Sequence, residues 1–148
     1  MSIEQRIRKT SESLRQRGVT FAVLDNAQTD ALFQRVAEVF VDPEGQDAFR
    51  GELRRSRRRG VPIAYERYLQ GKLEQEVDTS QLFRWVCGNG TVDRICRLDY
   101  YAAAPAIELV CSTLDSNIET SWPGFFVEID VRRALLVTVD RFRLRYAR

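Results

Sequence analysis

Few residue types in this chain can do chemistry, because its 148 residues include no histidine. Without histidine, the sequence lacks the usual general base, the partner of a nucleophilic serine or cysteine, and the commonest metal ligand. Its cysteines are too few and too widely spaced for a zinc site, and each is interpreted as a small buried apolar side chain. They are Cys87, Cys96 and Cys111. We therefore expect no metal and no cofactor.

Carboxylates are the remaining route to catalysis. Asp115, Glu128, Asp130 and Asp140 can gather on neighbouring strands and hold a magnesium ion for phosphodiester cleavage. Glu128 and Asp130 share one face of a strand, but the same alternation makes them the polar, outward side of FFVEIDV. The GNG sequence at 88–90 lacks the lysine and the spacing of a phosphate-binding loop. We therefore expect no enzyme, and a magnesium-dependent enzyme remains the second alternative.

The densest cluster of one residue type is RRSRRRG (54–60), in which five of the first six residues are arginine. On a helix that buries Phe49 and Leu53, the arginines spread over an arc of about 200°. They occupy the last turns, where cations complement the negative end of the helix dipole. Residues 50–59 carry a net charge of +5 and residues 60–129 a net charge of −5. Three kinds of partner remain open for the arginines: carboxylates of this chain and solvent, an acidic protein surface, or nucleic acid.

The first half of the chain has the apolar spacing of helices. Ser2 and Gln5 form a capping pair for a first helix that ends at Gly18, and a short buried strand, VTFAVLD, follows. Asp30 is expected to cap a second helix. The buried face of that helix is expected to hold Leu32, Phe33, Val36, Val39 and Phe40. A third helix is expected over 46–59.

A fourth helix is expected to begin near Pro62, and a short fifth helix, QLFRWVCG, is expected before the GNG break. The fourth helix is expected to carry Tyr65, Tyr68, Leu69 and Leu73. These elements and the basic run lie in a helix-rich part, 1–88, of a single domain that spans residues 1–148.

The strand-rich part covers 91–146, where the period of the apolar residues changes to two. Around Cys96 and Leu98, the alternation with Arg97 and Asp99 predicts a strand with one solvated face. AIELVCSTL is a second strand, and FFVEIDV and ALLVTV pair as a hairpin. The tail, RFRLRYAR, has the pattern of an edge strand that its arginines protect from pairing. The predicted class is α+β, with N-terminal helices packed on a C-terminal antiparallel sheet of about four strands.

Composition indicates a soluble globular protein, with 44% apolar residues, 30% charged residues and a net charge of +2. The charged N-terminal segment lacks the apolar core of a secretory signal, and no apolar stretch approaches the roughly 20 residues that span a bilayer. An odd number of cysteines argues against a disulfide framework. We expect a cytoplasmic protein with no membrane segment.

Segregated charge without a catalytic constellation favours a protein that binds another protein. We predict a non-catalytic module whose partner has an acidic surface, by analogy with bacterial immunity proteins, which neutralise a cognate toxin by occluding its active surface. Nucleic-acid binding by the basic helix end is the first alternative, although interleaved aromatic residues are absent there. The predicted partner-binding residues are Arg54, Arg55, Arg57, Arg58, Arg59, Tyr101, Trp122 and Phe125. Trp122 fits a core position equally well.

Overall fold

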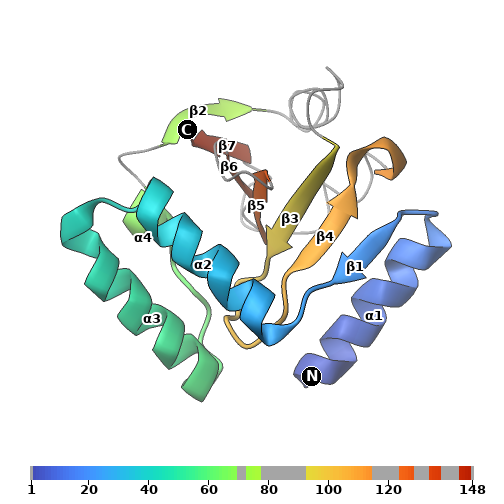
Figure 1. The fold of residues 1–148 in the computed structure, drawn as a ribbon, viewed down its shortest axis with the longest axis horizontal. Coiled ribbons are helices and arrows are strands. Elements are labelled where there is room, and N and C mark those ends of the chain that lie inside the picture. The colour runs from blue at the N-terminus through green and yellow to red at the C-terminus, as the bar shows by residue number, and fades with distance from the viewer. Residues whose placement is uncertain are drawn as a thin grey trace.

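The computed structural model describes residues 2–69, 93–114 and 124–128 with their side chains, and 73–77, 134–137 and 144–147 by their backbone. Its helices are α1 (Ile3–Gln16), α2 (Asn26–Phe40), α3 (Gln46–Arg59) and α4 (Tyr65–Leu69), with 3-10 turns η1 (Pro43–Gly45) and η3 (Cys111–Thr113) (Figure 1). Its strands are β1 (Phe21–Val23), β2 (Leu73–Val77), β3 (Arg94–Leu98), β4 (Ile107–Val110), β5 (Gly124–Glu128), β6 (Ala134–Val137) and β7 (Leu144–Ala147).

The described strands form one sheet in the order β1-β4-β3-β5-β6-β7-β2, and every neighbouring pair is antiparallel. The predicted α+β class is confirmed, and so is the hairpin, in which Phe125 of β5 lies opposite Leu136 of β6. The sheet has seven described strands rather than about four, because β1 and β2 from the first half of the chain pair at its two edges.

The tail strand and the fourth helix differ from their predictions. β7 lies between β6 and β2, so it is an inner strand and β2 takes the edge that the tail was expected to form. The fourth helix ends at Leu69, and Leu73 belongs to β2 rather than to that helix. Pairing with β7 explains the change, because a strand partner satisfies the backbone groups of 73–77 that a longer helix would otherwise satisfy. The predicted fifth helix lies outside the described residues.

The first two helices begin at capping boxes. In α1 the Ser2 hydroxyl accepts from the Gln5 N–H at 3.1 Å, and Gln5 Oε1 accepts from the Ser2 N–H at 2.9 Å, as predicted. The prediction that Asp30 caps α2 is wrong, because Asp25, five residues earlier, makes the same reciprocal pair with Gln28. Asp30 is thereby a residue of the helix and can reach a neighbouring helix.

One face of the sheet and the helices α2, α3 and α4 enclose the main core. In the register of β3 with β5, Cys96 lies opposite Val127 and Leu98 opposite Phe125, so these four side chains share that face. The Phe125 ring stacks on Tyr65 at 5.1 Å between centroids and meets Phe40 edge to face at 6.1 Å. Val39, predicted to be buried, is 43% exposed, because it lies on the side of α2 that faces away from this core.

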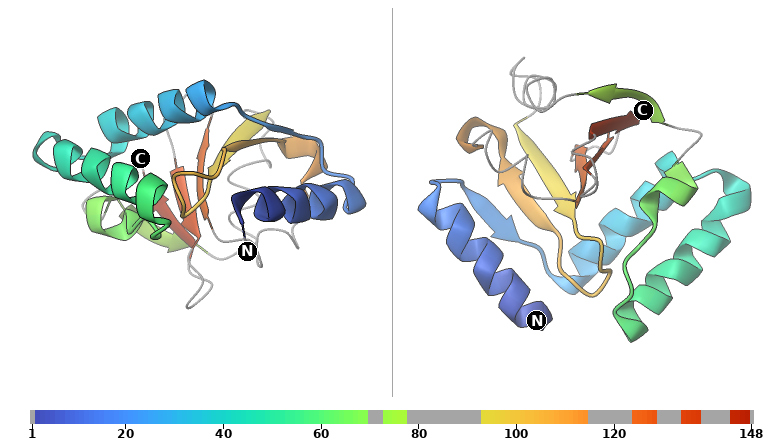
Figure 2. Two further views of the ribbon diagram at one scale, coloured as in Figure 1. Left: turned by 90° about the horizontal axis from the view of Figure 1, so that it is seen from below. Right: turned by 180° about the vertical axis from the view of Figure 1, so that it is seen from behind.

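Helix α1 packs on the opposite face, and the strands lie between it and α2 and α3 (Figure 2). That face carries Arg97 opposite Phe126, and the Phe21 ring of β1, over which the Arg15 guanidinium lies at 5.7 Å. The predicted solvated face of β3 is therefore wrong: Arg97 is 5% exposed and Asp99 7% exposed. Alternation in the sequence shows which side chains are polar, whereas the covering helix decides which are buried.

Candidate functional site

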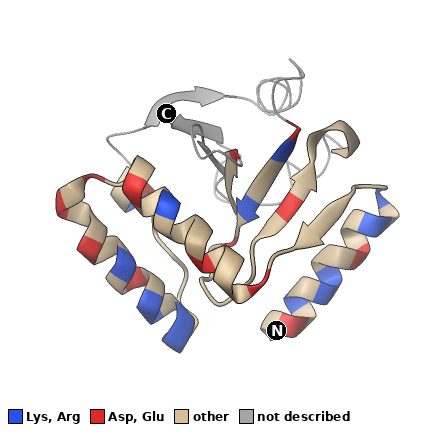
Figure 3. Cartoon of the chain, in the orientation of Figure 1, with Lys and Arg blue, Asp and Glu red and all other residues tan. Residues whose placement is uncertain are grey.

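The candidate site is the arginine face of α3, which we define as Arg54, Arg55, Arg58 and Arg59. Helix α3 turns Phe49, Leu53 and Ser56 toward the protein, at the spacing of one helical face. All four arginines are exposed, and they lie in the last two turns of the helix, where Figure 3 shows the basic residues of α3 gathered at its end. The predicted exposed, basic end of an amphipathic helix is confirmed.

Arg57 belongs to the same run but has a different environment. Its guanidinium forms an ion pair with Asp30 of α2, and its side chain is 37% exposed. The four residues of the arginine face form no hydrogen bond or ion pair with any other residue in the described parts of the chain. Of the five arginines predicted to bind a partner, one is thus used within the protein and four remain available.

Buried polar contacts hold the end of α3 in place. The Ser56 hydroxyl, 0% exposed, accepts from the Ala102 N–H at 2.9 Å, and Glu52 Oε1 accepts from the Ala64 N–H at 2.9 Å. Burial, followed by the Glu52 carboxylate, raises the pKa of the nearby Tyr68 hydroxyl. The helix stops at Gly60, which has a positive φ of 64° and donates to the Ser56 carbonyl. The arginine face is therefore presented on a backbone that is fixed on two sides.

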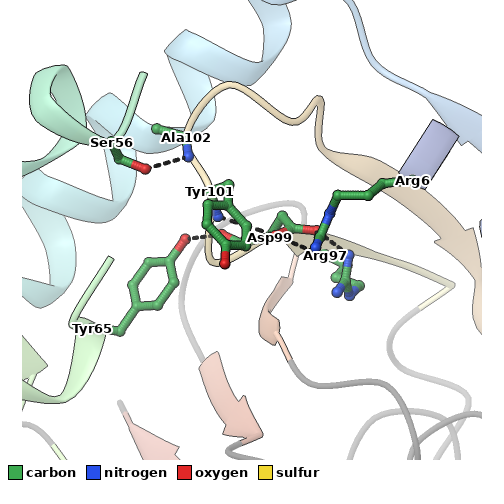
Figure 4. A network of polar contacts seen from close by, with 7 residues as sticks. All are labelled: Arg6, Ser56, Tyr65, Arg97, Asp99, Tyr101 and Ala102. Carbon is green, nitrogen blue, oxygen red and sulfur yellow. Dashed lines mark hydrogen bonds and ion pairs between the residues drawn. The ribbon is translucent and has the colours of Figure 1, made fainter. Parts of the chain in front are cut away.

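The loop that receives Ser56 is organised around Asp99 (Figure 4). The Asp99 carboxylate accepts from Arg6 at 3.2 Å, from Arg97 at 3.4 Å and from the Tyr101 N–H at 3.1 Å. The Asp99 carbonyl accepts from the Tyr65 hydroxyl at 2.6 Å. We call these five residues the Asp99 network. It joins α1, the end of β3 and α4 directly behind the end of α3.

Burial governs the electrostatics of this network. It lowers the pKa of the Arg97 guanidinium, and the Asp99 carboxylate opposes that effect by favouring the charged form. Burial also raises the pKa of Tyr65 well above its usual value, and the negative charge of Asp99 adds to the rise. Tyr65 therefore keeps its proton and donates to the Asp99 carbonyl, while the Asp99 carboxylate is the contact that favours the charged form of Arg97.

The aromatic residues predicted to bind a partner have different positions. Phe125 is 0% exposed and lies in the core between Tyr65 and Phe40, so the predicted role as an anchor on the surface is wrong. Tyr101 is half-buried, and the Arg6 guanidinium covers its ring at 4.7 Å from the centroid. Trp122 lies outside the described residues. When a phenylalanine lies between a turn and a strand, the sequence does not indicate which face of the sheet its ring will occupy.

The cysteines and carboxylates considered for catalysis are partly described. Cys96 and Cys111 are buried free thiols, and burial followed by the Glu108 carboxylate raises the pKa of Cys96 from 9.0 to about 11. Glu128 is 6% exposed, so its predicted solvated position is wrong, because β5 is buried on both faces. No group of three or more histidine, cysteine or carboxylate side chains that could hold a metal occurs among the described residues. Cys87, Asp115, Asp130 and Asp140 lie outside them.

Sequence reasoning missed Ser56 and Asp99 as organising residues. Ser56 had a usable signal, because it interrupts the arginine run at the position that continues the buried spacing of Phe49 and Leu53. Asp99 had none, since its partners Arg6 and Tyr65 lie far away in the sequence.

Comparisons with protein-family models, with curated proteins and with solved structures found no match to this chain. Within the described part of the chain, no helix combines the length and the apolar character needed to cross a membrane. The interpretation of the site therefore depends on its own geometry and charge.

Proposed function

We propose that this chain is a non-catalytic binding module that docks an acidic surface of another protein on the arginine face of α3. The observation that carries the proposal is the difference between Arg57, which has Asp30 as its partner, and the arginine face, whose four exposed guanidinium groups have none among the described residues. Like charges one turn apart destabilise a helix slightly, and they raise the local positive potential. A surface rich in carboxylates relieves both effects.

Rigidity of the support favours binding rather than a purely solvated role. Ser56 and Glu52 fix α3 to the segments around Ala102 and Ala64, so the backbone beneath the arginines is already ordered before a partner arrives. Association then loses the freedom of the arginine side chains but not that of the helix. Guanidinium groups also bind carboxylates through two parallel hydrogen bonds, which gives orientation as well as attraction.

In its specific form, the proposal is that the protein acts as immunity proteins do, by covering the active surface of a cognate toxin domain. Opposite charges would steer the encounter, and the arginines at the centre of the interface would exclude water as they pair. This mode needs a stable, charged surface and no catalytic group on the inhibitor.

The same positive charge attracts nucleic acid, so the experiment must distinguish nucleic-acid binding from binding of a protein. Proteins that hold single strands combine basic grooves with exposed aromatic side chains on which bases stack. The one aromatic residue of α3 is Phe49, and it is fully buried. This lack of a stacking platform along α3 favours a protein partner.

The test compares two variants with the same change of charge. Arg54→Glu with Arg58→Glu reverses two residues of the arginine face, whereas Arg8→Glu with Lys9→Glu reverses two exposed residues of α1. Partners are captured from a nuclease-treated extract of the native host and then titrated as purified proteins. We expect a 1:1 complex that the α1 variant retains and that the α3 variant weakens by at least about tenfold.

A partner held equally by both variants would contradict the proposal. Binding to generic DNA or RNA that weakens steeply with salt, and no protein partner, would replace it with the nucleic-acid alternative. If the recovered partner is a toxin, adding the wild-type protein is expected to abolish its activity in proportion to the complex formed.

A further inference from the structure

The outward side of α3 carries a straight line of residues that the core does not explain. Asp47, Gly51, Arg54 and Arg58 follow one another at spacings of four, three and four residues. At 100° per residue this spacing places all four on one line along the helix, directly opposite the buried line through Phe49 and Ser56. We call the four residues the outer line of α3.

Gly51 is the unusual member of the outer line. Glycine in the middle of a helix is unfavourable relative to alanine, so an internal glycine needs a reason. A Cβ at Gly51 would meet nothing closer than the Arg54 guanidinium, at 3.7 Å, which is an ordinary contact with the mobile end of a side chain. No close approach within the described parts of the protein therefore requires glycine there, and its position leaves room for an approach from outside.

The charges of the outer line change sign along the helix. Asp47 is fully exposed, and its nearest cation, Arg50, is 3.9 Å away and also donates to Gln34 of α2. Arg54 and Arg58 lie one turn apart beyond Gly51, and neither has a partner among the described residues. The line thus reads, from the start of α3 to its end, as one negative group, a gap and two positive groups.

We infer that the partner contributes an acidic α-helix that lies antiparallel along the outer line. In this arrangement two carboxylates one turn apart on the partner meet Arg58 and Arg54, a small residue faces Gly51, and a basic residue three turns from the first carboxylate meets Asp47. The rise of 1.5 Å per residue is the same in both helices, so side chains four residues apart on the partner match the spacing of Arg54 and Arg58. This inference rests on the proposed function and specifies the partner's structure.

Helix dipoles select the antiparallel direction. The arginines of α3 lie at its C-terminal end, where positive charge is favourable, and a partner running the other way has its carboxylates near its own N-terminal end, where negative charge is favourable. A second copy of this chain fits the line poorly. Two α3 helices placed antiparallel would pair Asp47 of each copy with Arg58 of the other, but each Arg54 would face Gly51 instead of a carboxylate. The two Arg54 side chains would then lie near each other at the centre, uncompensated.

The experiment uses two helical peptides of identical composition as probes of the full-length protein. The patterned peptide has glutamates at positions i and i+4, alanine at i+7 and lysine at i+11, and the permuted peptide has its glutamates two residues apart, on different faces. Binding is measured by fluorescence anisotropy at low ionic strength. We expect the patterned peptide to bind about threefold more tightly than the permuted one, because only one glutamate of the permuted peptide can align with Arg54 or Arg58.

Two variants connect the binding to the outer line. Gly51→Gln, a neutral substitution that favours the helix, is expected to remove most of the preference for the patterned peptide, because its side chain occupies the point of closest approach. Arg54→Glu with Arg58→Glu is expected to abolish binding of both peptides, whereas Arg8→Glu with Lys9→Glu leaves the preference unchanged. Circular dichroism confirms that each variant keeps its helices.

The contrary outcomes separate this inference from the proposed function. Equal binding of both peptides and of unstructured poly-glutamate, lost with Arg54→Glu and Arg58→Glu, would overturn the helical partner but keep an acidic protein surface. Binding of a single-stranded oligonucleotide in place of every peptide would overturn both. A dimer of this chain in sedimentation equilibrium, broken by Gly51→Gln, would overturn the inference in favour of self-association.

Discussion

Arg97 and Arg58 have the same side chain and opposite environments. Arg97 is 5% exposed and lies on the face of the sheet that α1 covers. Asp99 accepts its hydrogen bond at 3.4 Å, and a second arginine, Arg6, donates to the same carboxylate. Arg58 is exposed at the end of α3 and has no partner among the described residues. Burial makes the pairing of Arg97 essential, because an isolated buried charge is very costly, whereas water already solvates Arg58.

This difference shows that a dense run of arginines in the sequence does not indicate which arginines stabilise the fold. The run at 54–60 is the most conspicuous feature of the chain, yet only Arg57 among its arginines forms an ion pair within the described structure. Arg97 lies outside any arginine run, yet it contacts Asp99, the residue through which α1, β3 and α4 are joined. Conversely, the arginines that have no ion pair within the described residues are the ones that we propose for a partner.

The largest expected effect comes from removing the charge of Asp99. Asp99→Asn removes the negative charge that Arg97 and Arg6 share in a buried site, so the free energy of unfolding should fall by about 3 kcal/mol. The measurement is urea denaturation followed by circular dichroism. The matched control is Asp47→Asn, an exposed carboxylate on α3, for which we expect a change of less than about 0.5 kcal/mol. Equal effects of the two substitutions would remove the distinction between buried and exposed pairs.

A second substitution tests the packing around Arg97. A Cβ at Gly124 would lie 2.7 Å from Arg97 Nε and 3.2 Å from the Leu98 carbonyl oxygen, so Gly124→Ala must displace the buried guanidinium or the strand. We expect a loss of about 1–3 kcal/mol in the free energy of unfolding, of the size seen for overpacked cores. An unchanged midpoint in urea would show that Arg97 moves freely and that its position is not fixed by β5.

The burial of Cys96 in β3 also predicts that the free energy of unfolding falls at alkaline pH. The pKa of Cys96 is raised from 9.0 to about 11, so above pH 9 the unfolded chain loses a proton that the folded protein retains. The stabilisation is therefore complete below pH 9 and falls by about 1.4 kcal/mol per pH unit as the pH rises toward 11. Urea titrations at several pH values measure it, with Cys96→Ala as the control that removes this part of the slope. Identical slopes in the two proteins would contradict it.

Local patterns in the sequence predicted α1 and α3 well, the start of α2 and the end of α4 less well, and the burial of the strands poorly. The bounds of α3 and the cap at Ser2 follow from side-chain chemistry within a few residues, and the structure confirms them. The burial of Arg97, Glu128 and Phe125 depends on which helix covers which face, and that information lies elsewhere in the chain. The same reason explains the site: exposure of the arginines was predictable, whereas the pairing of Arg57 with Asp30 was not.

A smaller effect of opposite sign is expected at Gly51. Gly51→Ala should raise the free energy of unfolding by about 0.5–1 kcal/mol, because alanine favours the helix and the added Cβ meets only the end of Arg54 at 3.7 Å. Thermal and urea unfolding measure the gain, and Gly124→Ala is the contrasting substitution, in which the same methyl group meets buried atoms. A loss of stability at Gly51 would mean that the fold itself needs glycine there.

The smallest change in the free energy of unfolding is expected for the arginine face, which belongs to the most conspicuous run of the sequence. Arg54→Gln with Arg58→Gln removes two cations that repel each other one turn apart, and it also removes their favourable interaction with the C-terminal end of the helix dipole. These contributions are each a few tenths of a kcal/mol and of opposite sign, so the net change should stay within about 0.5 kcal/mol. Urea denaturation at low and at high salt measures both parts, because salt screens exposed charges. A loss approaching that of Asp99→Asn would show that the arginine face is paired within the protein, and it would leave no unpaired guanidinium groups for a partner.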